Sequence, residues 1–341
     1  MKLTLRTLPI TILCVSLVCG AAFAQVQPSP SGPAHSRFGL PVSRPEAPPT
    51  DLADRPAQSP NSPALTFTFG TMDFPGAHAS IADKINDKGQ VAGRYADCLI
   101  AGETCPNRLA AGHYGFRMSG SSFAKLSFPG ASQTGPLGIN KSSDIVGIYM
   151  LPDNSIHGFL LVGKTYTSID YPGAEYSYSL AINNSGQIVG YWDDASGLHG
   201  YLYSSGVFTS IDPPGSLYTE ADGIDNAGDI VGLYCDNVAC HGYLLHSGVF
   251  TTIDYPGATT TGVYGINDKG QMVGAYGTGA IVQNFDQQHA FLYDGTTFTS
   301  FDAPFGGVVI TWARGINNKS QIVGFYEDNT LSDFGFLASF K

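Results

Sequence analysis

The residues best suited to chemistry occupy two positions of an internal repeat, two and four places before a recurring Ile-Asn step. The copies differ at these positions, which carry acids, an arginine and aromatic rings in different copies. Residues two apart on a strand point to the same side, so we expect both positions to face one channel mouth. Such a mixture suits a sugar or peptide ligand. The candidate ligand-binding residues are Asp83, Tyr178, Glu220, Asp222, Tyr264, Trp312 and Arg314.

One histidine recurs in each of five copies, at His113, His157, His199, His241 and His289. Metal ligands gather in one place, whereas these histidines are spread one per copy. We therefore predict that each histidine is structural and caps a turn or pairs with a recurring aspartate. Aspartates recur before Pro at Asp170, Asp212, Asp254 and Asp302, where Asp at the first turn position bonds its own backbone. We expect no metal site and no cofactor.

Catalytic signatures are missing from the sequence. It contains no nucleophile elbow, no His-Glu-x-x-His and no phosphate-binding glycine loop. We therefore expect no catalytic residues. An enzyme stays open as an alternative, because a glycoside hydrolase or lyase would use Asp83, Glu220 or Asp222 as acid and base. The carboxyl groups of such enzymes lie about 5–9.5 Å apart.

The repeat predicts the elements that position these side chains. Ile-Asn or Ile-Asp steps begin at residues 85, 139, 182, 224, 266 and 316, spaced by 54, 43, 42, 42 and 50 residues. Each copy has four short runs of β-branched and aromatic residues separated by turn signals, typical of a four-stranded antiparallel blade. The prediction is all-β, a six-bladed β-propeller over residues 65–341. A β-solenoid is the rival fold, but its rungs are usually shorter.

The two ends of the repeat region complement each other. The last copy stops before a fourth strand, and residues 66–73 form an orphan strand that resembles the missing one. We expect the N-terminal strand to pair in the last blade and remove an open sheet edge.

The first 64 residues differ from the rest. Lys2 and Arg6, an apolar run over residues 10–18 and Ala22-Phe23-Ala24 predict a signal peptide over residues 1–24, with cleavage near Ala24. The predicted localisation is secreted or periplasmic. Residues 25–64 are rich in Pro, Ser and Ala, so we interpret them as a disordered linker.

Charge and cysteine usage narrow the partners. The net charge is −11, only 13% of residues are charged, and Lys and Arg form no cluster, which argues against nucleic acid. No long apolar stretch follows residue 18, so we expect no membrane insertion. Two cysteine pairs bracket equivalent loops and predict disulfides, Cys98 with Cys105 and Cys235 with Cys240. A metal site using Cys235, Cys240 and His241 is the weaker alternative.

The units resemble the HAF-type extracellular repeat family, named for a His-Ala-Phe signature. Residues 289–291 carry it literally, and residues 157–159, 199–201 and 241–243 carry His-Gly-Phe or His-Gly-Tyr. The Gly-Ile-Asn and Gly-Gln-Ile-Val-Gly segments also fit, and the resemblance spans about residues 66–341. The chain departs from the family pattern in its Ile-Asp-x-Pro-Gly turns. The resemblance implies an exported repeat protein of undefined activity and supplies no catalytic residues.

Three functions fit the sequence. The leading hypothesis is a secreted, non-catalytic module that binds a carbohydrate, peptide or protein at the channel mouth. The alternatives are the glycoside hydrolase or lyase described above and a purely structural component of an envelope or matrix.

Overall fold

The computed structural model describes residues 65–97, 112–277, 288–330 and 332–341. Within these ranges the regular structure is β-strand, in 24 strands. No helix among these residues is long and apolar enough to cross a membrane. The predicted signal peptide, linker and Cys98–Cys105 bridge lie outside the described residues, as does the side chain of His113.

Antiparallel pairing divides the strands into consecutive groups of four, here called units 1 to 6. Units 1 and 2 contain β2 (Ala79–Ile85), β3 (Val91–Asp97), β4 (Gly112–Ser119), β5 (Ser122–Leu126), β6 (Gln133–Ile139), β7 (Ile145–Met150), β8 (Ile156–Val162) and β9 (Thr165–Ile169). Units 3 and 4 contain β10 (Ser177–Ile182), β11 (Ile188–Asp194), β12 (Gly197–Ser204), β13 (Val207–Ile211), β14 (Tyr218–Ile224), β15 (Ile230–Cys235), β16 (Cys240–His246) and β17 (Val249–Ile253). Units 5 and 6 contain β18 (Thr260–Ile266), β19 (Met272–Gly277), β20 (Gln288–Tyr293), β21 (Phe298–Phe301), β22 (Val308–Ile316), β23 (Gln321–Asp328), β24 (Asp333–Phe340) and β1 (Phe67–Thr71).

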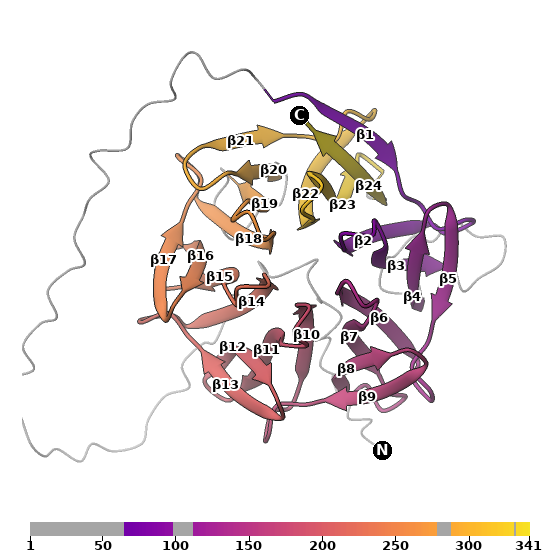
Figure 1. Ribbon diagram of the computed structural model, residues 1–341, viewed down its shortest axis with the longest axis vertical. Coiled ribbons are helices and arrows are strands. Elements are labelled where there is room, and N and C mark those ends of the chain that lie inside the picture. Colours follow the sequence, from indigo (N-terminus) through magenta and orange to yellow (C-terminus); the bar gives the residue numbers. More distant parts are fainter. Residues whose placement is uncertain (1–64, 98–111, 278–287, 331) are drawn as a thin grey trace, which may run out of the picture. The chain divides into compact units, whose positions relative to one another are not determined.

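The units lie around a central axis, with the first strand of each unit next to the axis (Figure 1). The fourth strand of each unit lies at the outside, and β1 takes this place in unit 6 by pairing with β24 from Phe67 opposite Phe340 to Thr71 opposite Phe336. Units 3 to 6 are also joined to one another by single parallel residue pairs. This radial arrangement of four-stranded antiparallel sheets is the β-propeller architecture.

Left-handed backbone positions produce the hairpins between the first and second strands. Gly186 has φ 79°, and the equivalent residues Ser143 and Ser320 have φ 72° and 60°. The serines therefore adopt the same turn as glycine, although a side chain makes that conformation costly.

The Asp-x-Pro-Gly segments carry the chain from one unit to the next. In the segment between units 2 and 3, Ala174 N donates to Tyr171 O at 3.2 Å and Gly173 has φ 85°. This is the geometry of a type II turn with Pro172 at its second position. The aromatic residue of the turn then stacks on a ring of the following unit, as Tyr171 does on Trp192 at 4.0 Å between centroids. Equivalent stacked pairs are Phe74–Tyr95, Phe128–Tyr149 and Tyr255–Tyr276. These contacts bury the apolar faces of neighbouring sheets against each other.

Candidate functional site

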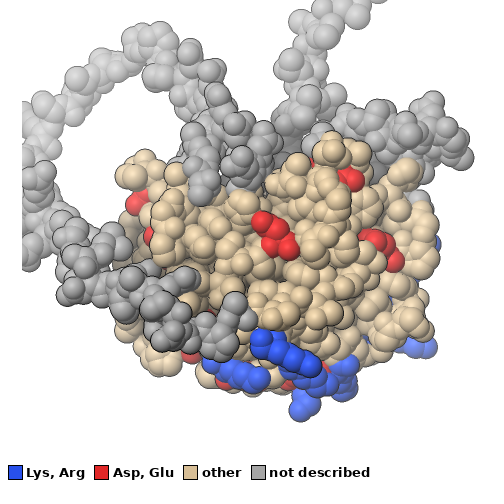
Figure 2. Space-filling model, turned by 90° about the horizontal axis from the view of Figure 1, so that it is seen from above, with Lys and Arg blue, Asp and Glu red and all other residues tan. Residues whose placement is uncertain are grey.

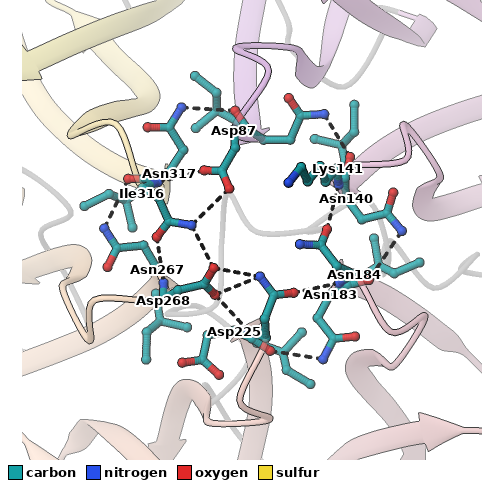
Figure 3. Close-up of a pocket in the computed structure, with 18 residues that line it drawn as sticks. Asp87, Asn140, Lys141, Asn183, Asn184, Asp225, Asn267, Asp268, Ile316 and Asn317 are labelled. Atoms are coloured by element: carbon teal, nitrogen blue, oxygen red, sulfur yellow. Dashed lines mark hydrogen bonds between the residues drawn. The ribbon is translucent and has the colours of Figure 1, made fainter.

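The described residues form a hollow at one mouth of the central channel. The hairpins that follow the first strand of each unit surround it, and their side chains point toward one another around the axis (Figure 3). Its lining consists of three residues from each unit, namely residues 85–87, 139–141, 182–184, 224–226, 266–268 and 316–318. We call the three layers, from the interior outward, the isoleucine ring, the amide ring and the hairpin ring.

The amide ring is built by the Asn of the Ile-Asn step. In unit 3, Asn183 Oδ1 accepts hydrogen bonds from the backbone of Ser185 and Gln187 at 3.1 and 3.0 Å, which holds its own hairpin. Its Nδ2 donates to Gln187 Oε1 at 2.7 Å and to the carbonyl of Asp225 in the next unit at 3.0 Å. A single carboxamide therefore shapes one unit and links it to the next.

The same amide-to-carbonyl link recurs around the axis. It joins Asn86 to Asn140, Asn140 to Asn183, Asn183 to Asp225, Asn267 to Asn317 and Asn317 back to Asn86, at 2.8–3.3 Å. Unit 4 interrupts the ring, because Asp225 lacks the amide hydrogens that would reach Asn267. Burial, and then the charge of Asp229, raise the pKa of the Asp225 carboxyl, while backbone hydrogen bonds lower it.

The hairpin ring forms a second circle with one interruption. Each backbone N–H donates to the side-chain Oδ1 of the next unit, from Lys141 to Asn184, Asn184 to Asn226, Asn226 to Asp268, Asp268 to Asn318 and Asn318 to Asp87, at 2.8–3.0 Å. The interruption lies at unit 2, because the Lys141 side chain carries no acceptor. Its side chain extends from the hairpin toward the axis instead (Figure 3).

Side-chain hydrogen bonds fix one half of the hairpin ring. Asn226 Nδ2 donates to both carboxylate oxygens of Asp268 at 2.8 Å, and Asn318 Nδ2 donates to Asp268 and Asp87 at 2.7 and 3.0 Å. Burial would raise the pKa of the Asp268 carboxyl, but these hydrogen bonds and the charge of Lys141 hold it below its usual value. Asp268 is therefore a fixed carboxylate facing the hollow.

Positive charge gathers unevenly on the surface. In the view of Figure 2, the visible Lys and Arg side chains lie mostly along one edge, whereas Asp and Glu side chains are scattered. Four exposed lysines belong to the Ile-Asn hairpins that surround the hollow, namely Lys88, Lys141, Lys269 and Lys319. The mouth therefore carries exposed ammonium groups as well as hydrogen-bonded carboxylates and amides.

The seven predicted ligand-binding residues do not line this hollow. All are buried, with at most 8% of each residue exposed. The residue two places before the Ile is the unpaired residue of a β-bulge in every unit, at Asp83, Leu137, Leu180, Asp222, Tyr264 and Arg314. A bulge re-aims the extra side chain. The carbonyl two residues before the bulge faces a glycine of the second strand, where a Cβ at Gly190 would lie 1.7 Å from Tyr178 O.

Three charged residues meet at the bulge of unit 1. Arg94 on β3 binds Asp83 through Nε and Nη2, at 3.0 and 3.2 Å, and Arg314 Nη2 lies 3.4 Å from the same carboxylate. All three are at most 6% exposed. One buried carboxylate thus contacts two guanidinium groups from distant parts of the chain.

Lys84 differs from the residues at the same position in the other five units. The equivalent residues are Gly138, Ala181, Gly223, Gly265 and Gly315, which pack close to the backbone of neighbouring units. Lys84 Nζ donates to the carbonyls of Tyr264 and Arg314 at 2.6 and 2.7 Å. Burial, and then the charge of Arg314, lower the pKa of the amine to about 7, although Asp222 and Asp83 oppose this.

Two carboxyl groups of unit 4 lie near this cluster. Burial and the charge of Glu220 raise the pKa of the Asp222 carboxyl well above its usual value, and Lys84 and Arg314 lower it only in part. Tyr218 Oη donates to Glu220 Oε1. In this environment Asp222 favours its protonated form.

The structure brings most of the seven predicted residues together. Asp83, Asp222 and Arg314 share one electrostatic environment with Lys84, and Glu220 acts on Asp222. Tyr264 stacks on Trp312 at 5.2 Å and lies under the Arg314 guanidinium. Tyr178 instead stacks on Tyr191 of the adjacent strand. Sequence reasoning missed Lys84, Arg94 and the hairpin ring, whose variation between copies was the available signal.

The predicted structural role of the histidines is confirmed where their side chains are described. Nδ1 of His157, His199, His241 and His289 contacts Asp170, Asp212, Asp254 and Asp302 at 2.8–3.2 Å. Each turn aspartate therefore binds a histidine 13 residues earlier. The sequence had instead predicted a bond from the aspartate to its own backbone. The predicted Cys235–Cys240 disulfide is present, with an S–S distance of 2.02 Å. Among the described residues, no group of three or more His, Cys, Asp and Glu side chains could hold a metal ion.

Comparisons with known proteins add likenesses of structure but none of sequence. No protein-family model and no curated protein matches the chain. A lectin from Aleuria aurantia solved with alpha-methyl-L-fucoside superposes with a TM-score of 0.47 at 12% identity, covering 80% of this chain and 96% of that one. The propeller domain of the Trilobed protease from Pyrococcus furiosus gives 0.44 at 11% identity, with 76% and 95% covered. TolB from Acinetobacter baumannii gives 0.48 at 11% identity, with 67% and 55% covered. No ligand or activity of this chain follows from values this low.

Proposed function

We propose that this protein is a non-catalytic binding module that holds a carbohydrate in the hollow at the Ile-Asn mouth. The observation that carries the proposal is the geometry of this hollow, where fixed carboxylates and amides point toward one another around the axis. Asp268, Asn226, Asn318 and Asp87 are held by mutual hydrogen bonds before any ligand arrives. Such preorganisation lowers the ordering cost of binding.

The chemistry of the hollow favours a sugar over a peptide or protein. Planar carboxylate and amide groups accept from and donate to neighbouring hydroxyl groups, which a sugar ring presents in pairs. The isoleucine side chains pack into the hydrophobic cores of the sheets, so the carboxylate and amide groups would make the contacts with the sugar. A peptide or protein ligand is the alternative outcome of the same test.

A glycan array followed by titration of the best ligand tests this function. Asp268→Asn keeps the side-chain shape but removes the fixed charge, and we expect affinity to fall about tenfold. Asp302→Asn is the matched control, because Asp302 pairs with His289 away from the hollow. Binding of no glycan by the wild type, or equal affinity of Asp268→Asn and wild type, would contradict the proposal.

A glycoside hydrolase or lyase is the second candidate, favoured by the raised pKa of the Asp222 carboxyl, which burial and Glu220 cause. A protonated acid beside a second carboxyl is the pattern of a general acid. Asp83 does not suit the role, since Arg94 and Arg314 occupy its carboxylate. Asp222→Asn should abolish any glycan cleavage while leaving glycan binding in the hollow unchanged.

We further propose a closed six-bladed propeller of the HAF-type repeat family, exported after cleavage near Ala24. Closure is supported by the β1–β24 pairing and by the hydrogen bonds from Asn317 and Asn318 to the hairpin of unit 1. Export is supported by the sequence of residues 1–24 and by the Cys235–Cys240 disulfide. N-terminal sequencing of the protein from culture medium and periplasm tests it, with Gln25 as the expected first residue. An uncleaved protein confined to the cytosol would contradict it.

A further inference from the structure

The channel interior contains buried hydrogen-bond donors that have no acceptor among the described residues. Arg314 is 4% exposed, and its Nε and Nη1 atoms have no hydrogen-bond partner. Trp312 is 8% exposed, and its indole Nε1 likewise has none. Buried polar groups in proteins are nearly always paired, so a cluster of unpaired donors requires an explanation.

These donors belong to one place in the channel. Trp312 and Arg314 lie two residues apart on β22, at the bulge of unit 6. The ring of Tyr264 contacts both, at 5.2 Å from the Trp312 centroid and 5.4 Å from Arg314 Cζ. The indole and the guanidinium therefore flank the same tyrosine.

The acids around this place use only part of the Arg314 guanidinium. Arg314 and Arg94 both contact the carboxylate of Asp83, and Lys84 is a third basic group beside Arg314. Of the two remaining acids, Glu220 accepts from Tyr218, and the raised pKa of Asp222, caused by burial and Glu220, favours its uncharged form. Arg314 contacts the Asp83 carboxylate through Nη2, and Asp222 Oδ2 itself lacks a hydrogen-bond partner in the described part of the chain, so neither acid supplies an acceptor for Arg314 Nε and Nη1.

We propose that the channel contains a binding site for a small carboxylate, held by the unpaired N–H groups of Arg314 and Trp312. A carboxylate offers two oxygens and about four lone-pair sites, so it can accept from both side chains at once. Its delocalised charge matches a guanidinium better than a hydrated point charge does. This site goes beyond the proposed function, because neither residue lines the hollow.

Calorimetric titration with sodium acetate in a sodium chloride background of constant ionic strength tests the site. Trp312→Phe removes the indole N–H and keeps a stacking ring. Trp192→Phe is the matched control, since Trp192 Nε1 is also buried without a partner but stacks on Tyr171 and His199. We expect saturable acetate binding by the wild type and Trp192→Phe, and about tenfold weaker binding by Trp312→Phe.

Arg314→Lys provides a second variant, because lysine keeps the charge but loses the guanidinium donors, and it should also weaken acetate binding. Glycan binding by each variant serves as the folding check and separates this site from the hollow. Absence of saturable acetate binding by the wild type overturns the site. Equal competition by chloride, or the same loss in Trp192→Phe, also overturns it.

Discussion

The two levels of the central channel lie only two or three residues apart in each unit, yet they differ in how their polar groups are satisfied. At the amide ring the same residue recurs in five of six units, and each side chain bonds its own hairpin and the next unit. At the bulges the units carry four different residue types, with Asp in units 1 and 4, Leu in units 2 and 3, Tyr in unit 5 and Arg in unit 6. There the channel collects unpaired donors and shared charges.

This difference shows that the polar side chains repeated in most units are hydrogen-bonded, whereas several that occur in one unit are not. A residue repeated around an axis meets the same neighbour in every unit, so one good hydrogen bond is formed many times. A residue present once has no such partner and must be compensated by another unique residue, as Asp83 is by Arg94 and Arg314. Buried charged residues that occur in one unit therefore mark the part of the channel where a functional role is the better explanation of the residue type.

Asp83→Asn should have the largest effect on the free energy of unfolding. It removes the one negative charge shared by two buried guanidinium groups, so the free energy of unfolding should fall by about 3–5 kcal/mol. Asp170→Asn, at the exposed His157–Asp170 pair, should cost less than about 1 kcal/mol. Urea denaturation measures both. Equal losses would mean that the bulge cluster is no more constrained than the surface.

Lys84→Met should alter how stability depends on pH. Folding lowers the pKa of Lys84 from 10.5 to about 7 through burial and the charge of Arg314, so between these values the unfolded chain binds more protons. The contribution of Lys84 to stability is therefore complete above pH 10.5 and lost as the pH falls through about 7. The wild type should gain stability over Lys84→Met as the pH rises across this window.

The exposed hairpin residue Lys88 provides the control for that experiment. The difference between Lys88→Met and the wild type should stay constant over the same pH range. If the stability difference between Lys84→Met and the wild type also stayed constant with pH, the amine would not be desolvated in the folded protein.

Asp225→Asn should complete the amide ring. The new amide can donate to Asn267 as Asn183 does to Asp225, and the like charge beside Asp229 disappears. We expect a gain of about 1 kcal/mol in the free energy of unfolding, and a comparable loss for the reverse change Asn183→Asp. Denaturant midpoints measure both. A loss of stability in Asp225→Asn would mean that unit 4 differs from the others in more than this residue.

Lys141→Asn should have the smallest effect, since it fills the interruption of the hairpin ring at an exposed position. The Asp87 N–H would gain an acceptor, worth about 0.5 kcal/mol. The pKa of Asp268 should rise toward its ordinary value, because the Lys141 charge that helps lower it is removed. Carboxyl NMR titration detects that change, and an unaltered Asp268 pKa would contradict the contact across the mouth.

The sequence predicted the all-β repeat architecture because a period of about 42 residues with four strand-like runs leaves few other folds. The turn geometry at Gly173 and the pairing of the recurring histidines with aspartates followed from local chemistry. The burial of the seven candidate residues did not, because a bulge arises from the register between two strands. Alternation along one strand gives no sign of it.

What the sequence alone determined is the content of each unit, since strands, hairpins and turns depend on residues close together in the chain. What only the tertiary structure decided is how residues from different units meet on the axis. Lys84 reaches Tyr264 and Arg314 across 180 and 230 residues, and Asn317 closes its ring on Asn86 across 231. Such contacts depend on the positions of whole sheets, and a single copy of the repeat contains no information about them.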